Sequence, residues 1–261
     1  MNEEIKEVPH VLACDVGNSA VHFAHVHGDV VGEMQTIQIG RLGDLGSRLA
    51  ALWDQIPAPR KVAAASVNAV GTKALEAAVL EHLQQDVLLV GRDLPLPMQV
   101  DVEAPDKVGA DRVCAAVAAF DRLGVACVVA DFGSAITVDC VNDEGVFLGG
   151  AIMPGLRMSI KALHEQTSML PLVEPVNPDW VYGKNTSQAI AGGVVFGARG
   201  ALKELIESYA TELGHWPTVI ATGGDATLVV GDVNESGLVQ AIVPDLVLRG
   251  AAMAYYNTLA K

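Results

Sequence analysis

Residues 12–23 read LACDVGNSAVHF, so an aspartate and a glycine end an apolar, strand-like run. A second stretch, VVADFGSAITVD at residues 128–139, repeats the pattern, with Asp131 and Gly133 in the places of Asp15 and Gly17. In both stretches the apolar run leads into a tight turn and then into a second alternating segment, which is typical of a β-hairpin. The repetition indicates two halves of similar architecture.

The segments around the two turns predict the same opening order in each half. The first half is expected to contain strands at 10–15, 20–26 and 30–39, a helix at 41–56, a strand at 61–67, a helix at 71–85 and a strand at 87–90. The second is expected to contain strands at 125–131, 135–141, 145–153 and 217–222 and helices at 155–166, 186–213 and 247–259, with a helix over 106–123 joining the halves. A repeat of this length predicts two homologous domains, at residues 9–118 and 119–261.

The composition favours an α/β protein and argues against several partners. Of 261 residues, 51% are hydrophobic and only 5% aromatic, which suits buried strands. The formal net charge of −14 and the lack of a basic patch predict no nucleic-acid and no membrane partner. The acidic start MNEEIKEVPH lacks the apolar core of a secretory signal, and four widely spaced cysteines suit reduced thiols. We therefore expect a cytoplasmic location.

The two turns carry residue types that suit a phosphate ligand. Glycine tolerates a positive φ and lets a ligand approach the backbone, and successive N–H groups can surround an anion. The leading aspartate can hold a cation that neutralises phosphate oxygens. A single turn of this kind is usually structural. Two in one chain, each opening a set of strands, favour a polyphosphate bound in a cleft between the domains.

Six motifs carry a resemblance to the type III pantothenate kinase family, in both order and spacing. They are DVGNS (15–19), GADR (109–112), DFGSAITVD (131–139), GGAIMPGL (149–156), GKNT (183–186) and TGGDA (222–226). The resemblance covers about residues 11–257. It implies an α/β fold of two homologous ribonuclease H-like domains, as in actin-like ATPases, with a nucleotide cleft between them. It also implies a homodimer that uses ATP to phosphorylate pantothenate to 4′-phosphopantothenate, the first step of coenzyme A biosynthesis.

The same resemblance implies roles for individual residues. Asp111 would be the general base, Asp15 would lie near Mg²⁺ and ATP, and Asp131 would bind a monovalent cation, K⁺ or NH₄⁺. The implied ATP-binding residues are Asp15, Val16, Gly17, Asn18, Ser19, Ala20, Val21, His22, Gly133, Ser134, Gly223 and Gly224. The implied pantothenate-binding residues are Val102, Gly109, Ala110, Asp111, Arg112 and Thr186, the last reaching the substrate across a dimer interface.

The chain departs from the family's pattern at four positions. Ser19 and Ser134 stand where threonine is usual, and both keep the hydroxyl. Val102 stands where a tyrosine commonly contacts the substrate, so it bears on the acceptor pocket. His22 stands where some members carry a basic residue.

Two other functions remain open from the sequence. One is a regulatory protein on the same fold, like the Bvg accessory factor; the other is a kinase for a different small hydroxyl substrate. The retained Asp15, Asp111 and Asp131 favour catalysis over the first, since a regulator has no chemical need of them. The histidines at 22, 25 and 27 are interpreted as surface or packing residues rather than metal ligands.

Overall fold

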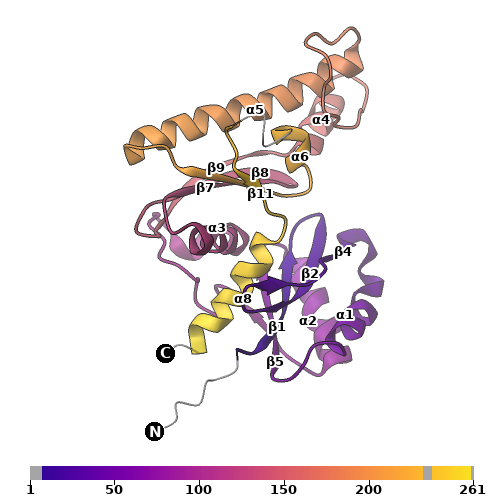
Figure 1. Ribbon diagram of the computed structural model, residues 1–261. Helices are drawn as coiled ribbons and strands as arrows, with labels where there is room; N and C mark the ends of the chain where they lie inside the picture. Colours follow the sequence, from indigo (N-terminus) through magenta and orange to yellow (C-terminus); the bar gives the residue numbers. More distant parts are fainter. Residues whose placement is uncertain (1–7, 232–236, 260–261) are drawn as a thin grey trace. The chain divides into compact units, whose positions relative to one another are not determined.

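The computed structural model describes residues 8–231 and 237–259, which form two compact units (Figure 1). The first unit contains residues 8–99, 103–118 and 245–259, and the second contains residues 100–102 and the described part of 119–244. Each unit has one β-sheet with helices packed against it. Among the described residues, no helix has the length and apolar character needed to span a bilayer.

The sheet of the first unit is built on strand β1 (His10–Val16), which pairs antiparallel with β2 (Ala20–His27) and parallel with β5 (Arg60–Ser66). The strand order is β3-β2-β1-β5-β6, where β3 is Val30–Val31 and β6 is Val87–Leu89. Because β1 and β5 are parallel, their carboxyl ends meet at one edge of the sheet. Asp15 lies at that edge.

Helices cover both faces of this sheet. On one face, α1 (Leu45–Trp53) and α2 (Ala69–Leu83) bury alternate residues of β1 in an apolar cluster. On the other, α8 (Leu246–Leu259) packs on β1, β5 and β2. With both faces covered, β1 reads as an almost unbroken apolar run rather than as an alternating one.

The chain between β2 and α1 differs from the expected strand at 30–39. The strand divides into β3 and β4 (Gln35–Gln38), and both pair with β2. Gly32 N donates to His25 O at 2.8 Å, within the interruption. The helix expected from residue 41 starts as a 3₁₀ segment, η1 (Ile39–Asp44), and becomes α-helical only at Leu45. Two glycines in RLGDLG weaken the first turn of that helix.

The second unit repeats the strand arrangement of the first. Its sheet order is β11-β10-β7-β8-β9, with strands at Cys127–Phe132 (β7), Ala135–Val141 (β8), Phe147–Pro154 (β9), Thr218–Thr222 (β10) and Ala241–Ile242 (β11). Its helices are α4 (Leu156–Glu165), α5 (Thr186–Leu213) and α6 (Ala226–Val230). The apolar cluster lies between this sheet and α5 and α6. β7 pairs antiparallel with β8 and parallel with β10, as β1 does with β2 and β5.

The two glycine turns have the same hydrogen bond at the same place in each sheet. Gly17 N donates to Ala20 O at 3.0 Å, and Gly133 N donates to Ala135 O at 3.0 Å. The second turn is therefore one residue shorter than the first. As a result, Ser19 and Ser134 are equivalent, since each directly precedes the alanine that opens the next strand.

Asn68 caps α2 and offers a test of the first unit's stability. Its Oδ1 accepts hydrogen bonds from Val70 N at 3.0 Å and Gly71 N at 2.9 Å. We expect Asn68→Ala to lower the free energy of unfolding by about 0.5–2 kcal/mol, because two helix N–H groups lose their acceptor. Asn68→Asp, which keeps the acceptor, should cost much less. Thermal melts of both variants check this, and an equal loss in the two would contradict the capping role.

Candidate functional site

The first glycine turn offers exposed polar groups at the carboxyl end of β1. Asn18 and Ser19 are exposed, and Asp15 is half-buried between β2 and β5. The other predicted nucleotide-binding residues of this loop are buried in the core, so only their backbone groups can face a ligand: Val16, Ala20 and Val21. The turn can thus present amide N–H groups, one amide side chain and one hydroxyl beside a carboxylate.

His22 lies on β2, directly opposite Asp15 in the strand register. Its Nδ1 is 2.9 Å from Oγ1 of Thr36, and burial lowers its pKa below the usual value. Burial therefore favours the neutral form of the ring over the charged one. At this position the chain supplies a hydrogen-bonding group rather than a cation.

Asp111 is the second residue of α3 (Ala110–Leu123). The helix expected over 106–123 is not continuous, because a short 3₁₀ turn, η2 (Pro105–Lys107), precedes α3. Oδ1 of Asp111 accepts a hydrogen bond from Arg112 N at 2.8 Å. Burial raises the pKa of this carboxyl, although the hydrogen bond and the Arg112 charge act in the opposite direction. A partly buried carboxylate with a raised pKa is a better proton acceptor than a fully exposed one.

Gly109 leaves the space that the Asp111 carboxylate occupies. A Cβ on Gly109 would lie 2.5 Å from Oδ1 of Asp111 and 3.4 Å from Cγ1 of Val67. Any side chain at residue 109 would therefore displace the carboxylate. This steric requirement explains a glycine at the start of GADR.

The charges of Asp15 and Asp111 both influence the buried thiol of Cys114 in the first unit. Burial raises the pKa of Cys114 well above its usual value, and the charges of Asp111 and Asp15 raise it further. The structure thus brings the predicted base and the first loop's carboxylate to one region of one unit. Gly250 of α8 packs directly on this part of α3, where a Cβ would overlap the backbone carbonyl of Cys114.

The second glycine turn is joined by two of the other motifs. Gly223, with φ of +92°, lies so close to β7 that a Cβ there would overlap Oδ1 of Asp131 and approach Phe132 O to 2.6 Å. Gly155 N donates to Ser134 O at 3.2 Å. The structure therefore brings DFGSA, TGGDA and the PG of GGAIMPGL together within the second unit. Among residues 8–231 and 237–259, no atom lies within 4 Å of the Cβ position of Gly224, so these residues leave its surroundings open.

An ion pair in the second unit was not found from the sequence. Asp225 is buried, and Nη1 of Arg157 contacts its two carboxylate oxygens at 2.8 and 3.0 Å. Asp225 N also donates to Phe132 O at 3.0 Å, so this pair fixes TGGDA against β7. A buried acidic residue needs a cation, but the burial of Asp225 is set by tertiary packing and cannot be predicted from TGGDA alone.

Thr186 is the exposed first residue of α5. The cap of this helix is Asn185, whose Oδ1 accepts from Gln188 N at 2.9 Å, and Gln188 Oε1 accepts from Lys184 N at 2.9 Å. A Cβ on Gly183 would lie 2.5 Å from Ala189 N. GKNT is therefore a tight helix start that presents Thr186 outward.

Val102 belongs to the second unit, whereas Gly109, Ala110, Asp111 and Arg112 belong to the first. Val102 lies against the start of β9, where a Cβ on Gly149 would be 3.5 Å from its Cγ1. The predicted acceptor residues are thus divided between the two units. The four GADR residues lie together in the first unit.

The described residues hold no group of three or more histidine, cysteine or acidic side chains arranged to bind a metal. Asp15 and Asp131 would each need backbone, water or phosphate oxygens to complete a cation site. The histidines contact one another instead: His10 Nδ1 is 2.8 Å from His25 Nε2, and the rings of His10 and His27 stack at 4.0 Å.

Known proteins resemble this chain over most of its length. Residues 11–208 match the family model of type III pantothenate kinase. Similar relatives are the type III pantothenate kinases of Dehalococcoides mccartyi strain 195 (31% identical, covering 94% of this chain and 96% of that one), Anaeromyxobacter sp. strain Fw109-5 (37%, 85% and 90%) and Legionella pneumophila strain Paris (34%, 94% and 97%).

Two solved structures are similar in fold. A conserved Baf family protein of Campylobacter jejuni has a TM-score of 0.57 at 20% identity, covering 96% of this chain and 100% of its own. MreB5 of Spiroplasma citri bound to ADP has a TM-score of 0.51 at 11% identity, covering 97% and 98%. The predicted fold class, α/β with two ribonuclease H-like domains of the actin-like ATPase type, is confirmed.

Proposed function

The chain belongs to the type III pantothenate kinase family, and on this premise we propose how its residues carry out the reaction. The protein is a phosphotransferase with an alcohol group as acceptor. It uses ATP with a divalent metal to convert pantothenate to 4′-phosphopantothenate, the first step of coenzyme A biosynthesis.

Asp111 is the base in this proposal. Its carboxylate takes the proton of the pantothenate hydroxyl as the hydroxyl oxygen forms a bond to the γ-phosphorus of ATP. The bond from that phosphorus to the β–γ bridging oxygen breaks, and ADP leaves with the electron pair. The observation that carries the assignment is the half-buried carboxyl at the start of α3, which accepts a hydrogen bond from Arg112 N and whose pKa is raised by burial. Phosphoryl transfer depends on such orientation and on charge neutralisation.

The two glycine turns are the proposed phosphate-binding loops. In the first, the exposed Asn18 and Ser19 and the N–H groups of the turn face the phosphates, and Asp15 holds the Mg²⁺ that neutralises them when ATP is bound. In the second, Ser134 offers a hydroxyl, and Gly223 and Gly224 offer backbone that a ligand can approach. The equivalent turn hydrogen bonds in both loops support this pairing.

Asp131 is the proposed ligand of a monovalent cation, K⁺ or NH₄⁺. Its carboxylate lies against Gly223, where the absent side chain leaves backbone close to the acid. Carboxylate and carbonyl oxygens are the ligands that hard cations take.

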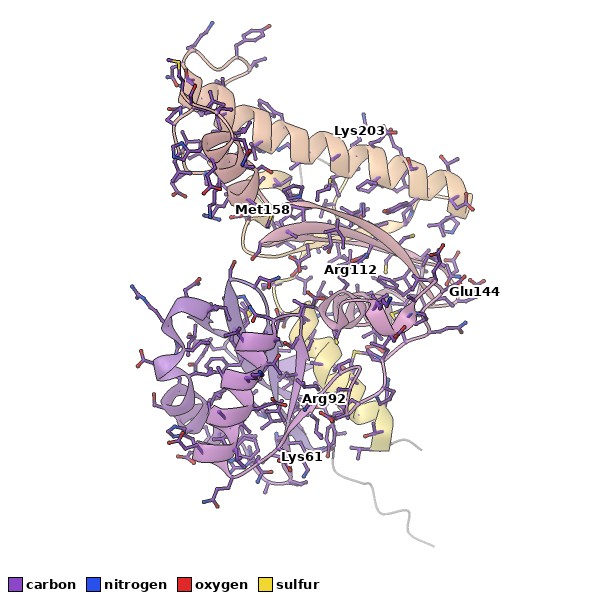
Figure 2. All side chains as sticks on the ribbon, turned by 180° about the vertical axis from the view of Figure 1, so that it is seen from behind. Lys61, Arg92, Arg112, Glu144, Met158 and Lys203 are labelled. Carbon is purple, nitrogen blue, oxygen red and sulfur yellow. The ribbon has the colours of Figure 1, made fainter. Side chains whose placement is uncertain are left out.

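Thr186 is the proposed contact to pantothenate from a partner subunit of a homodimer. Its outward position at the capped start of α5 supports this role. Large apolar side chains are exposed on β9, on α4 and in the segment before α5, among them Met158 (Figure 2). We assign these exposed side chains of the second unit to contact with a second copy of the chain: Ile152, Met158, Met169, Leu172, Val181 and Tyr182.

A cytoplasmic location and the absence of nucleic-acid partners are also proposed. The four cysteines are free and buried, which suits a reducing compartment. The net charge of −14 disfavours a phosphate backbone as partner. Homologous domains at 9–118 and 119–261 remain a proposal, although α8 packs with the strands of the first unit.

Purified protein with ATP, Mg²⁺ and pantothenate is expected to form 4′-phosphopantothenate, and K⁺ is expected to raise the rate strongly over Na⁺ alone. Mass spectrometry of the product and coupled detection of ADP measure both effects. Asp131→Asn is the matched variant and should lose most of the K⁺ response. Absence of product with every cation would refute the kinase, whereas equal rates with and without K⁺ would refute only the role of Asp131.

A further inference from the structure

Arg157 is the second residue of α4, and the start of this helix lies directly on the second glycine turn. Gly155, which precedes the helix, donates from its N to Ser134 O at 3.2 Å. A Cβ on Gly155 would lie 2.5 Å from both Gly133 O and Ser134 O, so backbone packs on backbone here. The position of Arg157 is therefore fixed relative to the turn that carries Ser134.

The TGGDA turn packs on the end of β7, the strand that leads into the second glycine turn. Asp225 N donates to Phe132 O at 3.0 Å, and Ala226 N donates to Gly223 O at 3.2 Å. A Cβ on Gly223 would lie 2.6 Å from the same Phe132 O, whereas no described residue lies within 4 Å of the Cβ position of Gly224. The turn thus contacts β7 at its first glycine and leaves its second glycine open to a ligand.

The carboxylate of Asp225 is directed to α4 rather than to the helix that it precedes. Asp225 is the N-cap residue of α6, a position at which an aspartate side chain usually accepts a hydrogen bond from the first turn. Within α6, all of which is described, no N–H group donates to this side chain. Instead, Nη1 of Arg157 donates to both carboxylate oxygens, at 2.8 and 3.0 Å. The aspartate therefore binds Arg157 in place of capping α6.

The two members of this ion pair differ in exposure. The side chain of Asp225 is 11% exposed, whereas that of Arg157 is 64% exposed. Removing the guanidinium would leave a buried carboxylate without this cation, which costs more than the loss of an exposed pair. Because Asp225 directly follows Gly224, its negative charge would also act on a polyphosphate bound at the glycines. The contact of Arg157 Nε with the exposed Glu174, at 3.7 Å, adds little.

We propose that Arg157 is a positioning residue for the nucleotide and acts through Asp225. The ion pair holds the backbone of Gly223 and Gly224 in the form that accepts ATP, and it neutralises a carboxylate that would repel the phosphates. Neither effect requires Arg157 to touch the nucleotide. The inference rests on the proposed function and adds a residue of α4 to its nucleotide site.

Arg157→Gln tests this role because it removes the charge and keeps a hydrogen-bonding side chain. We expect KM and the dissociation constant for ATP with Mg²⁺ to rise by about tenfold, within the range for leaving a buried acceptor without its charged partner. Because only nucleotide binding is weakened, kcat and KM for pantothenate should stay near the wild-type values. Steady-state kinetics and calorimetric titration with ATP measure these changes.

Adding Asp225→Asn to Arg157→Gln should restore most of the ATP affinity. The two amides can form a hydrogen bond with each other, and no buried charge is left unpaired. A direct contact between Arg157 and the nucleotide would not be restored in this way. The double variant therefore separates a role through Asp225 from direct binding.

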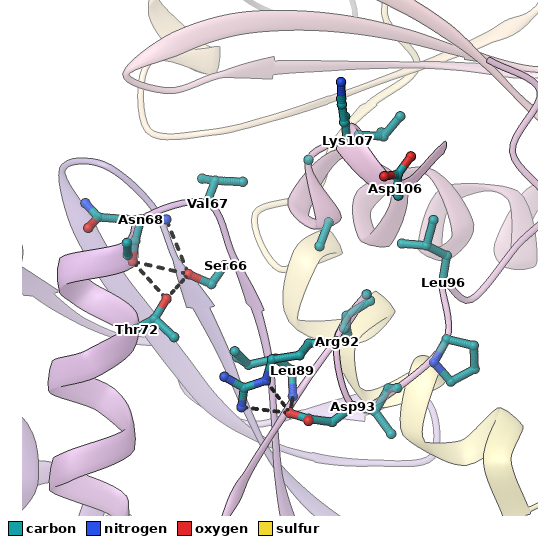
Figure 3. A pocket seen from close by; sticks show the side chains of 18 of the residues that line it. Ser66, Val67, Asn68, Thr72, Leu89, Arg92, Asp93, Leu96, Asp106 and Lys107 are labelled. Carbon is teal, nitrogen blue, oxygen red and sulfur yellow. Dashed lines mark hydrogen bonds and ion pairs between the residues drawn. The ribbon is translucent and has the colours of Figure 1, made fainter. Parts of the chain in front are cut away.

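Arg92→Gln is the matched control from the first unit. Arg92 contacts Glu76 at 2.7 Å and Asp93 at 2.8 Å, and Oδ2 of Asp93 accepts from Leu89 N at 3.0 Å, so this ion pair also holds a loop. These residues line a cavity of about 830 Å³ in the first unit (Figure 3). The side chains of Glu76 and Asp93 are 35% and 34% exposed, and neither belongs to a glycine turn. The same substitution should therefore leave the affinity for ATP unchanged.

Each outcome decides the proposal. Unchanged ATP affinity in Arg157→Gln overturns it, as does an equal loss in Arg92→Gln or a loss that Asp225→Asn does not restore. Should Arg157→Gln fail to fold, Asp225→Ala takes its place, because it breaks the ion pair and leaves no buried charge. Asp225→Ala should weaken ATP binding several-fold, and unchanged binding would overturn the proposal.

Hydrogen exchange separates this proposal from the function on which it rests. If the wild type forms no product and binds no ATP, the proposed function has failed. Amide exchange of residues 222–226 in the free protein then tests the hold on the turn without any nucleotide. Faster exchange in Arg157→Gln than in the wild type supports the hold, and equal exchange overturns it.

Discussion

Asp111→Asn is expected to lower kcat by about 10²–10⁴-fold, the range that a positioned general base contributes. The amide keeps the shape of the carboxyl and can still accept a hydrogen bond from Arg112 N, as Oδ1 does at 2.8 Å. It cannot take the proton of the acceptor hydroxyl. The loss should therefore appear in kcat with ATP binding unchanged, as measured by steady-state kinetics and nucleotide titration. Asp121→Asn, an exposed change on the same helix, is the control and should keep full activity.

The pH dependence of the two proteins sharpens this prediction. Burial raises the pKa of Asp111, so kcat/KM of the wild type should fall, as pH is lowered, at a higher pH than an ordinary aspartate near 3.9 would give. The residual kcat/KM of Asp111→Asn should not show this fall as pH is lowered. A variant with near-wild-type kcat, or one that still shows this fall, would show that another group accepts the proton.

Stability should change in the opposite sense to activity. A carboxyl with a folded-state pKa above its unfolded value stabilises the fold fully below the unfolded pKa, and this stabilisation is lost as pH rises through the folded pKa. At pH 7 the ionised Asp111 therefore destabilises the fold. Asp111→Asn should melt at a higher temperature than the wild type at pH 7, and this difference should shrink at low pH.

The sequence predicts the local parts of the site because their chemistry is local. A strand, an aspartate and a glycine turn stand next to one another in the chain, so Asp15 and Asp131 could be assigned to equivalent strand ends. Likewise, strands with helices packed on both faces appear in the sequence as apolar runs, so these strands could be predicted. Short elements have no such pattern, and α6 and β11, of five and two residues, were missed.

Contacts between distant segments could not be predicted in the same way. Arg157 and Asp225 stand 68 residues apart, and neither position shows its partner in the sequence. The strand expected at 30–39 is interrupted because β3 and β4 pair with different residues of β2. The alternation of apolar and polar residues does not show this break. Tertiary pairing decided these features, and a single sequence does not contain it.

Gly250 is the clearest example of a residue whose long-range contact cannot be predicted from the sequence. Nothing in LRGAAM indicates that α8 must touch α3. A Cβ there would overlap the backbone of Cys114, and backbone cannot rotate away as a side chain can. We expect Gly250→Ala to lower the free energy of unfolding by about 1–3 kcal/mol, as overpacking of a core does, and to lower the melting temperature by several degrees. Because Cys114 lies one turn after Asp111, the shift should also lower kcat more than it raises KM for ATP.

Gly200→Ala is the matched control for this substitution. Gly200 lies within α5, and outside the backbone of that helix no described residue has an atom within 4 Å of its Cβ position. The alanine should therefore leave stability unchanged or raise it by up to about 1 kcal/mol through helix propensity. The same chemical change is thus expected to have opposite signs on two helices, because only α8 is packed backbone to backbone at its glycine. If the two variants were equally stable, α3 would be able to shift away from α8 without loss of stability. Gly250 would then hold no part of the base in place.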